Sequence, residues 1–140
     1  MKKAITHFLL YLLSIIVWSC SKNNDDNGSD TLSIEEIEGL LTSGKWYQES
    51  KMPGSFSDCE KNISFQFNSD SSLIFDNYDD GNGTCEPQTP VTASYTLNDS
   101  ALHLTLGGSN VSASINSISD TELSITDFNG DMVTFDRIQG

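Results

Sequence analysis

The sequence predicts an all-β protein, an eight-stranded antiparallel up-and-down barrel preceded by one short N-terminal helix. From Gly44 onward, apolar residues recur at every second position in short segments, the pattern of strands with one apolar and one polar face. The connections after Leu97 are of hairpin length, and one short helix cannot cover so large a sheet. The sheet must therefore cover itself, and closing into a barrel also removes its open edges. A two-sheet sandwich is the alternative, but its Greek-key connections need long crossovers.

The N-terminus has a basic start at Lys2 and Lys3, then a mostly apolar run over residues 4–17. This pattern predicts a secretory signal, and the run is too short for an ordinary transmembrane helix. The segment Val17-Trp18-Ser19-Cys20 resembles the cleavage site of a bacterial lipoprotein signal. The resemblance implies that residues 1–19 are removed and that lipidated Cys20 becomes the new N-terminus, which attaches the protein to a membrane.

Residues 20–32 are predicted to form a flexible acidic tether, because residues 21–30 include no apolar side chain that a core could bury. Lys22 followed by Asp25 and Asp26 resembles the signal that sends Bacteroidota lipoproteins to the cell surface. This resemblance implies an outer-membrane or cell-surface location, with the periplasm-facing leaflet as the alternative.

The charge of the mature chain excludes several partners. Without residues 1–19 the chain keeps five basic and 20 acidic side chains, a net charge of −15. Nucleic-acid binding depends on basic contacts to phosphate, so no nucleic-acid partner is expected. Adsorption to anionic lipid is disfavoured too, so the acyl chains on Cys20 must provide the anchor. The remaining length, roughly 120 residues, suits one domain, predicted over 33–140 as a monomer.

The three cysteines of the chain predict one disulfide. Lipidation of Cys20 leaves Cys59 with Cys85, and an exported protein lies in an oxidising compartment. The bond would contribute on the order of 3–4 kcal/mol by closing a loop. A metal site at these thiols would need further ligands, and His103, the single mature histidine, has no metal-binding neighbours in sequence. We therefore expect no metal.

The predicted helix lies within residues 31–41. Ser33 and Glu36 fit a capping box at its start. Its apolar residues share one face and need a surface to cover: Ile34, Ile37 and Leu41.

Eight strands are predicted after the helix. The first spans residues 45–52, and the others centre on 63–67, 73–75, 93–97, 102–106, 111–115, 123–125 and 133–135. Asn129-Gly130 is the strongest short hairpin signal in the chain, and Gly107-Gly108 marks another turn.

Gly44 and Trp46 stand after the helix and at the start of the first strand, and Arg137 follows the last strand. In this order the chain resembles the lipocalins, specifically the short lipocalin-like domains of Bacteroidota lipoproteins, over roughly residues 33–139. The resemblance implies that Arg137 packs across the Trp46 indole, a cation–π contact of about 0.5–2 kcal/mol. The pair Cys59 and Cys85 also matches these small domains.

Two functions remain open. As lipocalins generally do, the barrel would bind a small hydrophobic ligand at its mouth, with Phe67, Phe75 and Tyr95 as candidate contacts. Alternatively, the barrel is filled and acts as an interaction module for a partner protein or glycan. A cavity of a few hundred cubic ångström would favour the first function. The predicted inward set consists of large residues: Phe65, Phe67, Phe75, Tyr95, Leu97, Leu102, Leu104, Leu106, Leu123 and Phe135.

Catalytic chemistry is not indicated, and neither an enzyme nor a cofactor is predicted. His103 alternates outward between Leu102 and Leu104. The acidic segment 76–83 fails the calcium-loop template, because its third position is Tyr78 and its twelfth is Pro87. A solvated hairpin loop is expected there.

Overall fold

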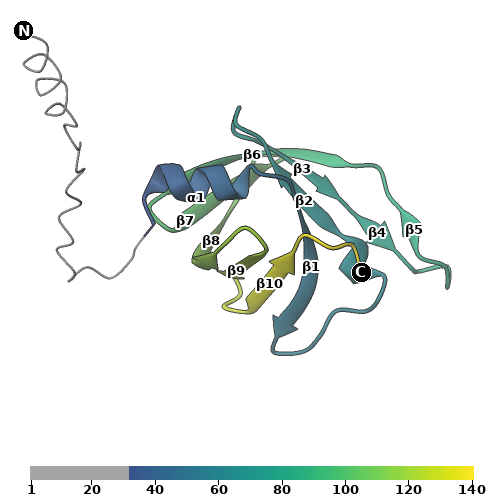
Figure 1. Ribbon diagram of the computed structural model, residues 1–140. Coiled ribbons are helices and arrows are strands. Elements are labelled where there is room, and N and C mark those ends of the chain that lie inside the picture. The colour runs from purple at the N-terminus through teal and green to yellow at the C-terminus, as the bar shows by residue number, and fades with distance from the viewer. Residues whose placement is uncertain (1–31) are drawn as a thin grey trace, which may run out of the picture. The chain divides into compact units, whose positions relative to one another are not determined.

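Figure 1 shows the computed structural model of the chain, which describes residues 32–140 as a closed β-barrel with one α-helix. Residues 32–140 form their own contact unit and contain their own core, so this part can be studied by itself. The predicted signal peptide at 1–19, lipidation at Cys20 and nearly all of the tether at 20–32 lie outside the described residues and stay predictions.

Eight strands close the barrel in the order β1-β10-β9-β8-β7-β6-β3-β2, and every neighbouring pair is antiparallel. β1 pairs with both β2 and β10, which completes the ring and leaves no open edge. The predicted up-and-down barrel is confirmed. Its strands are β1 (Lys45–Met52), β2 (Ser64–Phe67), β3 (Ser72–Asp76), β6 (Val91–Asn98), β7 (Ala101–Leu106), β8 (Ser109–Ile118), β9 (Glu122–Thr126) and β10 (Met132–Asp136).

Helix α1 (Ile34–Leu41) precedes the barrel and begins three residues later than the start of the predicted window. The predicted capping box is present: Ser33 Oγ accepts a hydrogen bond from the Glu36 amide, and the Glu36 carboxylate accepts one from the Ser33 amide. Ile37 and Leu41 are buried against the barrel, whereas Ile34, in the first turn, is exposed. Within residues 32–140, no helix is long and apolar enough to cross a bilayer.

Two small elements outside the barrel were not predicted from the sequence. Segment 77–90 contains strands β4 (Tyr78–Asp79) and β5 (Glu86–Pro87), which pair with each other and project beyond the barrel in Figure 1. A 3₁₀ turn, η1 (Glu60–Asn62), lies in the β1–β2 connection. The pairing of β4 with β5 covers only two residues in each strand, so it gives no periodic signal in a sequence. The solvated loop expected at 76–83 is therefore partly an ordered ribbon.

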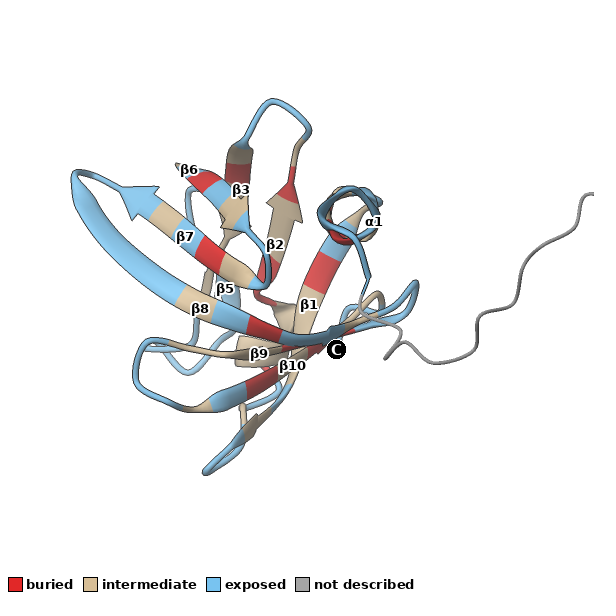
Figure 2. Cartoon of the chain, turned by 90° about the vertical axis from the view of Figure 1, so that its left-hand side faces the viewer, coloured by how far each residue is buried: buried red, intermediate tan, exposed pale blue. Residues whose placement is uncertain are grey.

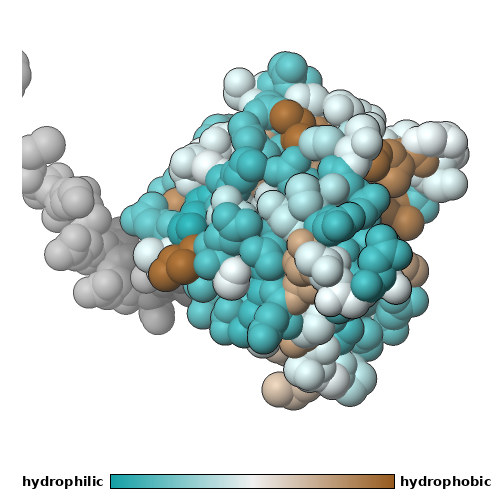
Figure 3. Space-filling model, turned by 90° about the vertical axis from the view of Figure 1, so that its right-hand side faces the viewer, coloured by the Kyte–Doolittle hydropathy of each residue, from teal (hydrophilic) through white to brown (hydrophobic). Residues whose placement is uncertain are grey.

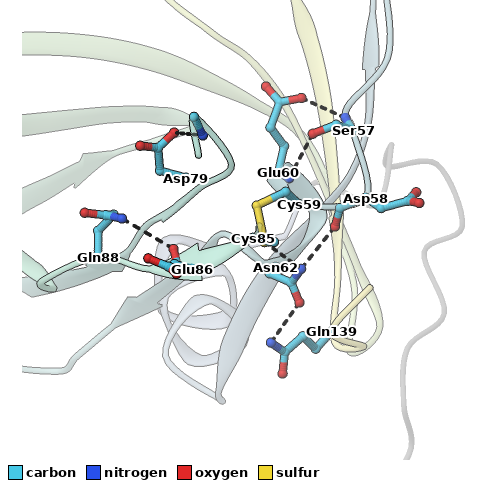
Figure 4. The surroundings of a disulfide bond; sticks show 11 residues. Ser57, Asp58, Cys59, Glu60, Asn62, Asp79, Cys85, Glu86, Gln88 and Gln139 are labelled. Atoms are coloured by element: carbon cyan, nitrogen blue, oxygen red, sulfur yellow. Dashed lines mark hydrogen bonds between the residues drawn. A yellow bond between two sulfur atoms is a disulfide. The ribbon is translucent and has the colours of Figure 1, made fainter. Parts of the chain in front are cut away.

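The predicted disulfide is confirmed, and it joins these two elements. Cys59 precedes η1, Cys85 precedes β5, and their Cα atoms are 5.4 Å apart. Figure 4 shows the bond beside Asn62, whose amide donates to the Asp58 carbonyl and accepts from Gln139 near the C-terminus. The disulfide thus ties the outer ribbon to the connection between β1 and β2.

The buried residues are spread over the strands of the barrel and α1, as the red segments in Figure 2 show. The surface in Figure 3 is mostly hydrophilic, with apolar residues in small separate groups. The prediction that Leu106 belongs to the barrel interior is wrong, because its side chain is 47% exposed. It ends β7 beside the Gly107-Gly108 turn, beyond the part of the barrel that other strands enclose. The core cluster contains Ile37, Leu41, Trp46, Phe67, Leu73, Tyr95, Leu102, Ile115, Leu123, Val133 and Phe135.

Candidate functional site

One end of the barrel is closed by helix α1 and by Trp46. The Trp46 side chain is fully buried, and its indole N–H donates to the Leu41 carbonyl at 3.0 Å. The predicted contact with Arg137 is present, with the guanidinium carbon 3.2 Å from the indole ring centroid. Burial lowers the pKa of Arg137, and the nearby Asp120 opposes this shift.

Arg137 also joins separate segments through hydrogen bonds. Its guanidinium donates to the carbonyls of Leu40, Lys45 and Asp120 and to the Ser43 hydroxyl. Gly44 lies in this closure with a φ of +155°, and a Cβ there would stand 3.5 Å from Arg137 Nη1. This end of the barrel is therefore a structural closure, which fixes α1 to the first and last strands.

The rest of the interior contains a cavity of about 310 Å³. It extends to the opposite end of β1 and β10, where Met52 pairs with Met132 and the β9–β10 turn begins. Aromatic rings support its wall: Phe65 packs edge-on against Phe135 at 5.4 Å between centroids. The lining is largely apolar and comes from six strands and one turn: Gln48, Phe65, Phe67, Leu102, Leu104, Val111, Ser112, Ala113, Leu123, Ile125, Asp127, Phe128, Val133 and Phe135.

The three predicted ligand contacts do not form one site. Phe67 lines the cavity. Phe75 pairs with Phe65 on the neighbouring strand, and its ring lies beside that of Phe65, 4.9 Å away between centroids. Tyr95 packs edge-on against Phe67 at 5.1 Å, and its hydroxyl donates to the Asn68 carbonyl at 2.9 Å. Burial raises the pKa of Tyr95. Neither Phe75 nor Tyr95 belongs to the lining, and a ligand role for Phe67 stays a prediction.

Sequence reasoning missed Gln48, a polar residue of the lining. Gln48 stands two residues after Trp46 in β1 and pairs with inward-facing Phe135. Its Oε1 atom is buried and accepts no hydrogen bond from any residue in the described part of the chain. The period of two would have placed Gln48 inward, since Trp46 faces inward. A buried polar atom without a partner is rare in folded proteins and needs an explanation.

The mouth of the cavity lies at the β9–β10 turn. The Asp127 carboxylate accepts hydrogen bonds from the amides of Asn129 and Asp131 and so shapes the turn. Phe128 lines the cavity and is nevertheless 67% exposed, so the cavity reaches the surface there. Other exposed apolar residues lie at this end of the strands: Met52, Leu106 and Met132.

Residues considered for chemistry at the sequence level lie elsewhere. His103 is exposed on β7, and its Nδ1 lies 2.7 Å from the Ser112 hydroxyl on β8. In the acidic segment, Asp76 forms an ion pair with Lys45 at 2.6 Å, and Asp79 accepts a hydrogen bond from the Gly81 amide. Among residues 32–140, no three metal-binding side chains cluster together.

Comparison with known proteins agrees with this architecture. The profile of the lipocalin-like domain matches residues 42–125, more than half of the chain. A crystal structure of a lipocalin-like protein from Bacteroides uniformis is 12% identical, with a TM-score of 0.55, covering 70% of this chain and 99% of that one. An uncharacterised protein from Bacteroides eggerthii is 13% identical, with a TM-score of 0.53, covering 69% and 99%. No curated protein matches the chain. The chain belongs to the lipocalin-like domain family.

Proposed function

We propose that this chain is a lipid-anchored envelope protein whose barrel binds a small, mostly apolar molecule. The observation that carries the proposal is the cavity of about 310 Å³. Its volume falls at the lower end of the range for small-molecule sites, which are typically apolar with a few placed polar groups. Lipocalin-like folds are generally binding folds rather than catalytic ones.

The cavity supports one of the two functions that the sequence left open. An eight-stranded barrel has just enough room to be filled by side chains or to hold one small ligand. Here the lining includes Ala113, whose short side chain lies beside Leu102 on the neighbouring strand and fills less of the interior than a large residue would. A filled interaction module would not need this space. The geometry therefore favours ligand binding over a role in contacting a partner protein or glycan.

Access from solvent is supported by the exposed Phe128 at the mouth. Because Phe128 both lines the cavity and is exposed to solvent, a ligand would contact its ring before it reaches the interior. We expect ligand exchange through this end, since α1, Trp46 and Arg137 close the other end.

The anchor is proposed from the resemblance of residues 1–20 to a lipoprotein signal. The acidic mature chain supports a covalent anchor over adsorption to anionic lipid. The proposed place is the outer membrane or the cell surface, with the periplasm-facing leaflet as the alternative, and the proposed state is a monomer.

Native mass spectrometry of the protein purified from its own host tests ligand binding directly. We expect a reproducible bound mass, in the range of a small apolar molecule, that is lost on unfolding. A second measurement titrates residues 32–140 with the fluorescent probe N-phenyl-1-naphthylamine.

A variant with a filled cavity makes this titration specific. Ala113→Leu adds a side chain to the lining and should abolish or strongly weaken probe binding. Ser114→Leu adds the same side chain at the next, exposed position of β8 and should bind the probe like the wild type. Equal binding by both variants, or no probe binding and no bound mass in the wild type, would refute the proposed function.

A further inference from the structure

We infer that the open end of the barrel docks onto the surface of a zwitterionic lipid bilayer, so that the cavity mouth faces the membrane. The inference rests on the proposed function, in which a lipid anchor holds the barrel at a membrane and the cavity takes an apolar molecule. It names the partner of the mouth, a lipid surface from which an apolar ligand enters the cavity without crossing water.

The topology places four connections at the open end. In an antiparallel barrel that runs up and down, every second connection lies at the same end. The connections that follow β1, β3, β7 and β9 therefore lie at the end opposite α1. Figure 2 shows the β7–β8 turn on the left of the barrel and α1 on the right. The cavity opens at this end, beside the exposed Phe128.

Most of the large apolar side chains that residues 32–140 expose lie at the open end. Six of the nine stand in one of these four connections or among the three strand residues next to one: Met52, Val91, Leu106, Val111, Phe128 and Met132. They come from five strands and one turn, so they surround the opening, and we call them the rim. Exposed apolar residues that are scattered singly are ordinary, whereas a gathering around one opening marks an interaction site.

The form of the rim favours a fluid partner over a rigid one. Its side chains come from separate connections, and exposed polar residues such as Asn110 and Asn129 stand between them. A protein interface needs a closely packed apolar centre, whereas lipid can move around single protruding side chains at the boundary of headgroups and acyl chains. Met52 is 71% exposed and, like Phe128, has most of its apolar surface left to bury.

The charges at the open end select zwitterionic over anionic lipid. The two lysines of β1 and the β1–β2 connection near this end already face carboxylates. Lys51 Nζ lies 3.9 Å from Glu60, and Lys61 Nζ lies 3.3 Å from Glu49. The β9–β10 turn and segment 77–90 add only acidic charged side chains. A membrane with a negative surface potential would therefore repel this end, whereas a zwitterionic surface carries no net charge to oppose the contact.

The proposed tether is long enough to allow the contact. Twelve peptide bonds join Cys20 to Leu32, where the described residues begin, and a chain of that length spans at most about 40 Å. The longest strand of the barrel, β8, has 10 residues and is about 33 Å long. It covers less than this along the barrel axis, because barrel strands are tilted. The open end can thus reach the membrane that holds Cys20, and the tether keeps its local concentration there high.

Quenching by brominated lipid tests which end of the barrel meets the bilayer. Residues 20–140, produced in an oxidising compartment, are coupled through the Cys20 thiol to a maleimide lipid in vesicles of brominated phosphatidylcholine. Cys59 and Cys85 are bonded to each other, so Cys20 is the thiol that reacts. Trp46 is the single tryptophan of this chain and is buried at the closed end, so the wild type gives the background.

Two tryptophan substitutions place the reporter at opposite ends. Phe128→Trp puts it on the rim, and Ile34→Trp puts it at an exposed position of α1 as the matched control. The emission added by Phe128→Trp should be quenched about fivefold more strongly than that added by Ile34→Trp, because only the rim enters the boundary of headgroups and acyl chains. Adding anionic phosphatidylglycerol to the vesicles should weaken this quenching.

Variants of the rim make the test specific. Met52→Ser together with Met132→Ser removes two apolar side chains that lie outside the cavity lining, and should reduce the quenching of Phe128→Trp about fivefold. Leu32→Ser together with Ile34→Ser removes two exposed apolar side chains at the start of α1 and should leave that quenching unchanged.

The outcomes separate this inference from the proposed function. Quenching of Ile34→Trp as strong as that of Phe128→Trp, or quenching that survives both rim substitutions, overturns the inference. Self-association of residues 32–140 that both rim substitutions abolish, without quenching in vesicles, also overturns it and assigns the rim to a second copy of the chain. In each case, binding of N-phenyl-1-naphthylamine without vesicles leaves the cavity function standing. Loss of that binding in the wild type overturns the proposed function instead.

Discussion

Replacing Arg137 with alanine should destabilise the barrel more than any other substitution of a charged residue in its described part. Its guanidinium stacks on the buried Trp46 ring and donates hydrogen bonds to Leu40, Ser43, Lys45 and Asp120. These partners come from the end of α1, the start of β1 and the β8–β9 turn. Arg137→Ala thus removes the contact that holds the closed end together.

The magnitude follows from these contacts. The cation–π contact is worth about 1 kcal/mol at a partly desolvated site. The hydrogen bonds together contribute about 2 kcal/mol, because water replaces part of each lost donor at the exposed atoms. The expected loss is therefore about 3 kcal/mol, which lowers the melting temperature of a domain of this size by roughly 10 °C.

The assay is urea unfolding of residues 32–140, followed by Trp46 fluorescence and circular dichroism. Lys51→Ala is a matched control, since Lys51 also lies over an aromatic ring, Phe56, at 4.8 Å. Lys51 is at the surface, and its ion pair with Glu60 is long, at 3.9 Å, so its loss should cost less than about 1 kcal/mol.

Arg137→Lys separates charge from geometry. A lysine keeps the positive charge but cannot reproduce the planar fork that reaches several carbonyls, so an intermediate loss is expected. A destabilisation by Arg137→Ala no larger than that by Lys51→Ala would show that the Trp46 contact does not close the barrel. Affinity for N-phenyl-1-naphthylamine should be unchanged, because Arg137 is outside the cavity lining.

Three further predictions concern other parts of the chain. Cys59→Ser, or reduction of its bond to Cys85, should lower the free energy of unfolding by about 3.5 kcal/mol for a closed loop of 26 residues, measured by urea unfolding with and without reductant; an equal midpoint would contradict it. Cys20→Ser should release the full chain from the membrane fraction while the barrel still binds N-phenyl-1-naphthylamine, as cell fractionation would show; a variant retained in membranes contradicts the lipid anchor. Ser33→Ala should destabilise the barrel near pH 7. The Ser33 backbone N–H and, to a smaller extent, the Ser33 hydroxyl donate to the Glu36 carboxylate and lower its pKa. Ser33→Ala removes only the hydroxyl's part, which is present above the unfolded pKa of Glu36 and is lost as the pH falls through the folded pKa. Unfolding measured from pH 7 to pH 3 should show the difference between the two proteins shrinking; a constant difference would contradict it.

Local patterns predicted most of the fold. Alternation of apolar and polar residues located the eight strands of the barrel, because each strand buries one face and the pattern is carried by consecutive residues. The capping pair Ser33 and Glu36 located the start of α1, since both partners lie within one turn. The family resemblance identified the contact of Trp46 with Arg137. Segments β4 and β5 escaped prediction, because a pairing of two residues leaves no period.

The cavity depends on how side chains from different strands pack against one another, and they come into contact only when the barrel closes. Phe67, Phe75 and Tyr95 are all aromatic residues of predicted strands. In the structure, Phe67 lines the cavity, Phe75 packs beside Phe65, and the Tyr95 hydroxyl donates a hydrogen bond to the Asn68 carbonyl. Alternation says which face a side chain occupies but not how much space its neighbours across the barrel leave.

By itself, the sequence predicted the barrel and its disulfide, because the first rests on alternation between consecutive residues and the second on a count of cysteines. The tertiary structure alone decided that the interior around Ala113 stays open and that Gln48 Oε1 is buried without a hydrogen-bond partner among residues 32–140. Both depend on residues from six strands that are distant in the chain. Packing across a closed barrel is a property of their joint arrangement, which no single segment specifies.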